Sequence, residues 1–67
     1  MFRNLEAEQK RFSLTNSEVA DRLGISRVTY ESKKKTGKFT RSEIVTLLSM
    51  FNCKFEYLFA MDTIQSA

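Results

Sequence analysis

Proline is absent from this 67-residue chain, and glycine occurs only twice, as Gly24 and Gly37. Turns in β-rich folds depend on these two residue types, so their scarcity argues against strands and hairpins. The length allows a single domain, and a hydrophobic content of 42% suffices for one compact core. The composition therefore predicts an all-α fold.

Histidine is also absent, and Cys53 is the only cysteine. A single cysteine cannot form an internal disulfide, and the usual zinc-ligand sets cannot form without histidine. The chain has no Cys–His pair and no glycine-rich phosphate loop. We therefore expect no catalytic residues, no metal and no cofactor, and we predict that the protein is not an enzyme.

Long apolar runs are missing as well. None approaches the roughly 20 residues that span a membrane. Glu6 and Glu8 stand where a signal peptide needs an apolar segment. We expect a soluble cytoplasmic protein with no membrane partner.

Positive charge, in contrast, is concentrated in one segment. The net charge is only +3, but residues 26–41 contain six basic residues and one acidic residue. Residues 1–25 are balanced, and residues 42–67 are net negative. A local positive field of this kind is typical of a surface that binds a polyanion. A solvated lysine-rich turn would produce the same pattern, so charge alone leaves both interpretations open.

Capping signals and apolar spacing predict five helices. Thr15 and Thr40 are each followed three residues later by glutamate, which is the capping-box pattern of a helix start. Gly24 and Gly37 suit the left-handed conformation that ends a helix. Lys54 stands where a capping Ser or Thr is usual, so the last helix is weakly specified. The expected helices span residues 2–12, 15–23, 26–35, 40–52 and 54–61, followed by a frayed tail at 62–67.

The fourth helix carries the densest apolar set and is expected to be the central core helix. Its apolar residues are Ile44, Val45, Leu47, Leu48 and Phe51.

The second and third predicted helices are separated by a short turn. Gly24 makes the turn, Ile25 fills the core behind it, and Ser26 caps the next helix. Ala20 is small where the two helices would cross, and Tyr30 is placed to anchor the second one inward. Two helices joined by a short glycine-containing turn, the second of them basic at its end, form the unit that enters a DNA major groove.

The segment 14–27, LTNSEVADRLGISR, resembles the first helix, turn and start of the recognition helix of phage-repressor and Cro-like proteins. The similarity covers most of the chain and is typical of a branch common in Firmicutes and their phages. It continues at Thr29-Tyr30, Lys33, Gly37, Phe39-Thr40, Glu43-Ile44 and Phe55-Glu56-Tyr57-Leu58-Phe59.

This resemblance implies a five-helix lambda-repressor-like helix-turn-helix domain. It further implies a sequence-specific regulator of transcription that reads the major groove of double-stranded DNA with helix 26–35. Such a protein would come from a phage or mobile element and act in the bacterial cytoplasm or nucleoid. A repressor is expected, because a domain this small has no evident surface for recruiting polymerase.

The same resemblance assigns base-reading residues on the third helix. Arg27 would donate two hydrogen bonds to guanine, Val28 would contact a thymine methyl group, and Glu31 would accept from cytosine N4. An ordinary surface pair between Glu31 and Lys35 would explain those two residues equally well. The full base-reading set is Ser26, Arg27, Val28, Glu31, Ser32 and Lys35.

Phosphate contacts, which supply affinity rather than sequence preference, are expected from a second set of residues. This set is Asn16, Ser17, Lys33, Lys34, Lys38 and Arg41. The family usually has glutamine at position 16, and it has an aromatic or aliphatic residue followed by glutamate near positions 33 and 34. The stems of the two lysines found there would pack while their ammonium groups reach solvent.

Recognition of an operator by this motif usually requires a dimer. We expect Phe55 and Leu58 to pack in the core and the remaining apolar residues near the C-terminal end to form a homodimer interface. These interface residues are Tyr57, Phe59, Met61 and Ile64. An alternative is that the same fold binds a partner repressor protein instead of DNA, with the lysine cluster against an acidic patch.

Overall fold

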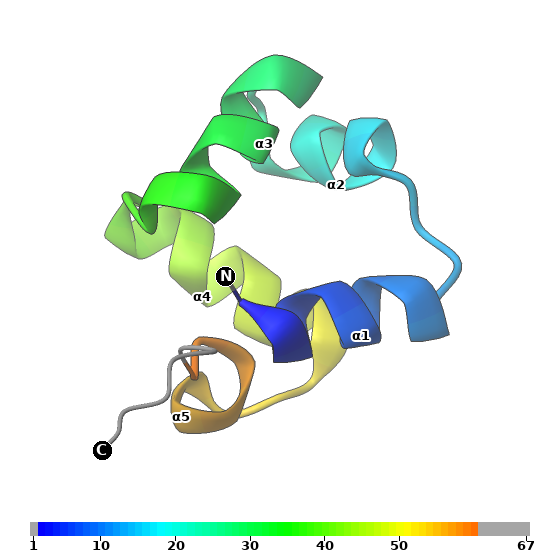
Figure 1. Ribbon diagram of the computed structural model, residues 1–67, viewed down its shortest axis with the longest axis vertical. Coiled ribbons are helices and arrows are strands. Elements are labelled where there is room, and N and C mark those ends of the chain that lie inside the picture. The colour runs from blue at the N-terminus through cyan, green and yellow to red at the C-terminus, as the bar shows by residue number, and fades with distance from the viewer. Residues whose placement is uncertain (1, 61–67) are drawn as a thin grey trace.

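The computed structural model describes residues 2–60 and contains, over that range, five helices and no strands. The all-α prediction is confirmed. The helices are α1 (Arg3–Arg11), α2 (Asn16–Leu23), α3 (Arg27–Thr36), α4 (Arg41–Phe51) and α5 (Phe55–Leu58) (Figure 1). Among residues 2–60, no helix combines the length and the apolar character needed to cross a membrane.

The helix boundaries follow the predicted caps. Thr15 and Thr40 each accept a hydrogen bond from the third backbone N–H of the next helix, and the glutamate at that third position accepts from the threonine N–H. Gly24 and Gly37 end α2 and α3 with φ angles of 75° and 77°, where a Cβ would be strained. Asn52, with φ of 52°, ends α4 in the same way. The first four helices therefore agree with the predicted ranges to within one residue at either end.

The fifth helix is shorter than predicted. It ends at Leu58, and Phe59 is its C-cap residue with φ of −105°. Lys54 provides no side-chain cap, so the first turn of the helix lacks that source of stabilisation. The N–H of Ala60 bonds the carbonyl of Tyr57, three residues back, which closes a turn instead of continuing an α-helix. Met61 and the predicted tail 62–67 lie outside the described residues.

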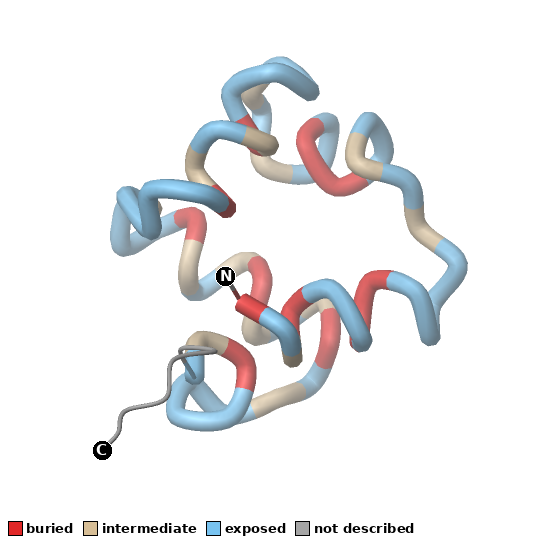
Figure 2. Tube along the Cα trace, viewed as in Figure 1, coloured by how far each residue is buried: buried red, intermediate tan, exposed pale blue. Residues whose placement is uncertain are grey.

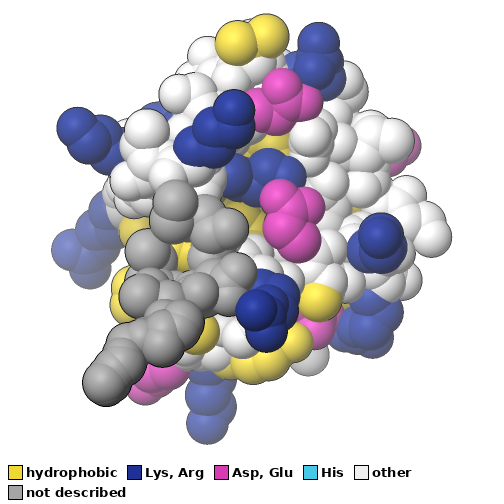
Figure 3. All heavy atoms as spheres, viewed as in Figure 1, with side chains coloured by type: hydrophobic (Ala, Val, Ile, Leu, Met, Phe, Trp, Pro, Cys, Tyr) yellow, Lys and Arg dark blue, Asp and Glu magenta, His cyan; other side chains and the backbone are white. Residues whose placement is uncertain are grey.

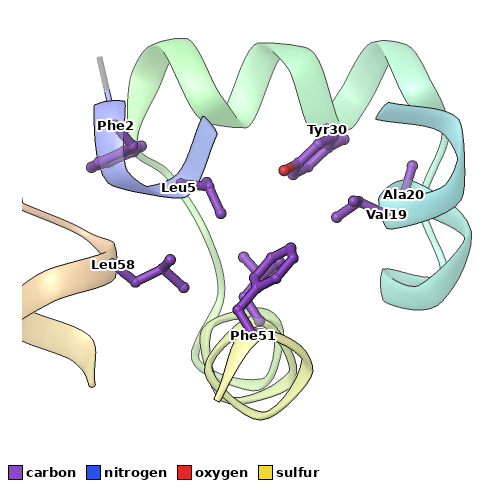
Figure 4. Packing of buried hydrophobic residues seen from close by; sticks show 8 residues of the cluster. Phe2, Leu5, Val19, Ala20, Tyr30, Phe51 and Leu58 are labelled. Carbon is purple, nitrogen blue, oxygen red and sulfur yellow. The ribbon is translucent and has the colours of Figure 1, made fainter. Parts of the chain in front are cut away.

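The helices surround one core. α2 and α3 pack together at one end, α1 and α5 lie at the other, and α4 runs between the two pairs (Figure 1). The buried stretches of the chain lie toward the middle of the molecule, and most of the exposed stretches lie toward the outside (Figure 2). All five helices contribute buried apolar side chains, and Figure 4 shows them pointing toward one another. The core residues are Phe2, Leu5, Val19, Ala20, Tyr30, Leu47, Phe51 and Leu58.

Two residues predicted to lie in the core are exposed instead. Val45 is 57% exposed because α4 buries the stripe of Leu47 and Phe51, and a residue two positions before Leu47 lies on the other side of the helix. Phe55 is 51% exposed and stacks on Phe59 with 5.4 Å between ring centroids. Leu58, three residues later, is the buried residue of α5.

Candidate nucleic-acid interface

A hydrogen-bonded turn joins α2 to α3. The N–H of Gly24 donates to the carbonyl of Asp21, and the N–H of Ile25 donates to the carbonyl of Ala20 at 3.0 Å. Ala20 is 1% exposed, and Ile25 packs against the core. The side chain of Ser26 caps α3 by accepting from the N–H of Thr29. The predicted roles of these residues in the turn are confirmed.

Tyr30 holds α3 against the rest of the protein. Its side chain is fully buried, and its hydroxyl donates a 2.7 Å hydrogen bond to Oε1 of Gln9 on α1. Burial raises the pKa of Tyr30 far above its ordinary value, so the hydroxyl stays a neutral donor. α3 therefore has one fixed inward side, which determines the side that faces solvent.

The outward side of α3 and its N-cap residue together carry five of the six residues predicted to read bases. Val28 is 65% exposed, the most of any large hydrophobic residue described as exposed. The other four exposed members are Ser26, Arg27, Ser32 and Lys35. In Figure 2 most of the outer side of α3 is drawn as exposed.

Glu31, the sixth residue, is only partly exposed and is engaged within the protein. Its Oε2 accepts from Nη1 of Arg27 at 2.8 Å and from Nδ2 of Asn16 at 2.9 Å. The Asn16 amide and then the Arg27 guanidinium hold the pKa of Glu31 below its ordinary value. The ion-pair partner of Glu31 is therefore Arg27, one turn earlier, and not Lys35 as the alternative interpretation supposed.

Asn16 connects this cluster to α1. Its Oδ1 accepts from Nε2 of Gln9 at 2.9 Å and from Nζ of Lys34 at 2.9 Å. With Nδ2 donating to Glu31, both polar atoms of the Asn16 side chain already have partners inside the protein. Ser17, next to it in the first turn of α2, is exposed. A phosphate contact at this helix start is thus open to Ser17 and to the free backbone N–H groups.

Lys34 does not belong to the exposed basic surface. The residue is 8% exposed, and its ammonium group donates to Oε2 of Glu6 at 2.8 Å as well as to Asn16. It also lies 4.8 Å from the centroid of the Tyr30 ring. The expectation that its ammonium group reaches solvent and phosphate is therefore wrong, because Glu6 on α1 binds that group inside the protein.

The other predicted phosphate ligands divide into two groups. Lys33 is partly buried, and its Nζ lies 3.2 Å from Oε1 of Glu43 and donates to the carbonyl of Lys38. Lys38 and Arg41 are exposed, as is Lys35. These last three cations form what we call the basic rim, at the end of α3 and the start of α4.

A shallow hollow of about 270 Å³ lies between α1 and α3. Its charged side chains are two carboxylates and two ammonium groups, and Figure 3 shows basic and acidic side chains close together on this face. The two carboxylates and the two ammonium groups cancel in formal charge, so the hollow has no net charge to attract an ion. The lining residues are Phe2, Glu6, Asn16, Glu31, Lys34 and Lys35.

Two of the predicted dimer residues, Tyr57 and Phe59, lie within the described range, and both make contacts inside their own domain. Tyr57 is 43% exposed, but its hydroxyl donates to Oε2 of Glu8 and its carbonyl accepts from Nδ2 of Asn4. Phe59 packs edge-on against Phe2 with a centroid separation of 5.4 Å. Both residues therefore tie α5 to α1. Met61 and Ile64 lie outside the described residues.

Three glutamates have depressed pKa values in the folded protein. For Glu8 the causes are the Tyr57 hydroxyl and then Arg11, and for Glu31 they are those given above. Burial opposes ionisation of Glu43, but the Thr40 N–H and the Lys33 ammonium outweigh it and lower the pKa. Each carboxylate therefore contributes stability above its ordinary pKa of 4.5, and this contribution is lost as the pH falls through the lowered value.

We accordingly expect the melting temperature to fall as the pH drops below 4.5, measured by circular dichroism from pH 7 to pH 3. Glu43→Gln is the informative variant, because glutamine at this position keeps the capping box but does not titrate. Its melting temperature should fall less steeply with acid than that of the wild type. Equal acid sensitivity of the two proteins would contradict the assignment to Glu43.

Within residues 2–60, no group of three or more His, Cys, Asp or Glu side chains is placed to hold a metal ion. Sequence reasoning did not find the contacts of Glu6, Gln9 and Glu8 with α2, α3 and α5. The partners lie 7 to 49 residues away along the chain, so no local pattern signals them.

The chain forms a small all-α domain in which one helix, α3, is anchored on one side by Tyr30 and exposed on the other. Comparison of the chain with protein-family models, with curated proteins and with solved structures finds no match.

Proposed function

We propose that this protein is a sequence-specific DNA-binding repressor of transcription, with a lambda-repressor-like helix-turn-helix domain that places α3 in the major groove. The observation that carries the proposal is the two-sidedness of α3. Tyr30 is fully buried on one side, while Arg27 and Val28 project from the other at the start of the helix. The N-terminal residues of a recognition helix are those that contact base edges.

The chemistry of the exposed residues supports this function. A guanidinium group can donate two hydrogen bonds to guanine, a valine can contact a thymine methyl group, and a serine can pair with several bases. Val28 gains almost nothing for folding at its exposed position, and contact with a partner would bury it. The side chains that carry these groups are Arg27, Val28 and Ser32.

The basic rim also supports the proposed DNA-binding function. Lys35, Lys38 and Arg41 lie at the far end of α3 from Arg27, where cations contact phosphates and fix the register of the helix. Ser17 and the start of α2 offer backbone donors to another phosphate. We propose that the protein acts as a homodimer on two half-sites about one helical turn apart, roughly 34 Å.

Selection of bound duplexes from a random library tests this function. The wild type should enrich a defined sequence, and Arg27→Ala should lose the preference at one base pair, worth about 1–3 kcal/mol, while the rest of the sequence persists. Lys10→Ala is the matched control, since it removes one exposed positive charge from α1. It should leave the preference unchanged.

Two outcomes would count against the proposal. A preference that Arg27→Ala leaves intact would move the reading surface away from α3. Absence of any enriched sequence, together with tight binding to a repressor protein, would instead favour the alternative in which this fold blocks another regulator.

A further inference from the structure

Arg27 is held in place before any ligand binds. It is the first residue of α3, and its Nη1 donates to Oε2 of Glu31 one turn later, at 2.8 Å. The same oxygen accepts from Nδ2 of Asn16, the first residue of α2, at 2.9 Å. The arginine is thus connected through one carboxylate to the neighbouring helix.

This arrangement leaves a defined part of the guanidinium group available. Among the hydrogen bonds of residues 2–60, Arg27 uses Nη1 only. The edge formed by Nε and Nη2 therefore retains two parallel N–H groups. That edge matches the O6 and N7 acceptors of guanine, which lie side by side in the major groove.

Glu31 could either contact a base itself or orient Arg27, and its position distinguishes these two roles. Its Oε2 already has two donors, and the Glu31 side chain is 35% exposed, against 54% for Arg27. Glu31 is therefore less accessible to solvent than Arg27 and is bonded to it. A carboxylate in this place orients the arginine more readily than it reaches a base.

We propose that Glu31 is a positioning residue that, braced by Asn16, directs the Nε–Nη2 edge of Arg27 toward a guanine. The proposal rests on the DNA-binding function above and specifies how one base pair is read. Holding a long side chain in its bound rotamer before association removes part of the entropic cost of binding. Glu31 then acts through Arg27 and has no base pair of its own.

The experiment compares selected sequences for the wild type, Glu31→Ala, Arg27→Ala and the double variant. Glu31→Ala should weaken the guanine preference at the same base pair that Arg27→Ala affects, by a factor of roughly 2 to 150, the range of coupling between contacting residues. In the Arg27→Ala background it should add nothing at that position. Asn16→Ala should shift the same position in the same direction.

The conservative variant Glu31→Gln should restore the guanine preference that Glu31→Ala weakens. Glutamine keeps an acceptor oxygen for Nη1 of Arg27, so most of the guanine preference should return. Were Glu31 itself reading cytosine, the preference would change at a neighbouring base pair and glutamine would favour adenine there. Glu56→Gln on α5 is the charge-matched control and should leave every position unchanged.

The outcomes separate this inference from the proposed function. Loss at a different base pair, or effects of Glu31→Ala and Arg27→Ala that simply add, would overturn the positioning role and leave DNA binding intact. A wild type that enriches no sequence would overturn both. Melting curves of each variant show which of them are folded, and non-specific DNA affinity at low salt should not fall for Glu31→Gln, because the basic rim is unchanged and a negative charge is removed.

Discussion

Replacing Tyr30 with alanine is expected to leave the protein largely unfolded at 25 °C. The ring is fully buried between α1, α2 and α4, and truncation of a buried aromatic residue costs about 3–5 kcal/mol. A domain of this length rarely has more than about 3–5 kcal/mol of stability in total. The loss therefore consumes most or all of the free energy of unfolding.

Helical circular dichroism and urea titration measure this effect. Val28→Ala is the matched control, because it truncates a residue on the same helix that is 65% exposed. Its stability should stay within about 0.5 kcal/mol of the wild type. The stability of Tyr30→Phe should fall between the two, since it leaves the buried side-chain oxygen Oε1 of Gln9 without its donor at a cost of about 1–3 kcal/mol. A folded Tyr30→Ala protein with a near-normal urea midpoint would show that α3 is anchored elsewhere.

The second large effect concerns the salt dependence of the proposed DNA binding. If the three cations of the basic rim each neutralise one phosphate, the slope of log affinity against log salt should be about −2.7 for one protomer. Affinity would then fall about 40-fold between 50 and 200 mM salt. The buried Lys34 and the paired Lys33 are left out of this count because their ammonium groups have acidic partners.

Removing two of these charges should flatten the dependence. For Lys35→Ala/Lys38→Ala the slope should be near −0.9, so the same change in salt weakens binding only about 3.5-fold. Lys10→Ala/Lys54→Ala removes two exposed lysines from α1 and the start of α5 and is the charge-matched control. Equal slopes for the two double variants would mean that net charge, and not the basic rim, attracts DNA.

The helix boundaries were predictable from the sequence to within one residue for four of the five helices. The hydrogen bonds that set them are local. Thr15 and Thr40 bond glutamates three residues away, and the two glycines end helices through their own backbone angles. The inward position of Tyr30 was predictable for a similar reason, because side-chain direction follows from the helical period.

The partners of the interface residues were not predictable in this way. Lys34 was expected to reach solvent, but Glu6, 28 residues away, lies above it and binds it. Glu31 was expected to face a base or Lys35, but Asn16, 15 residues away on α2, and Arg27 hold it instead. The Arg27 pair has the ordinary i,i+4 spacing of one helix, whereas the Asn16 contact depends on tertiary packing. Charge and spacing along one helix cannot reveal which carboxylate or amide another helix brings to it.

The sequence by itself determined where the helices begin and end, that the fold is all-α, and which side of α3 faces inward. The tertiary structure decided which polar groups on α3 are free to meet a partner. Helix starts and ends depend on hydrogen bonds within five residues of chain. The contact of Glu31 with Asn16 and that of Lys34 with Glu6 depend instead on how α2 and α1 pack against α3.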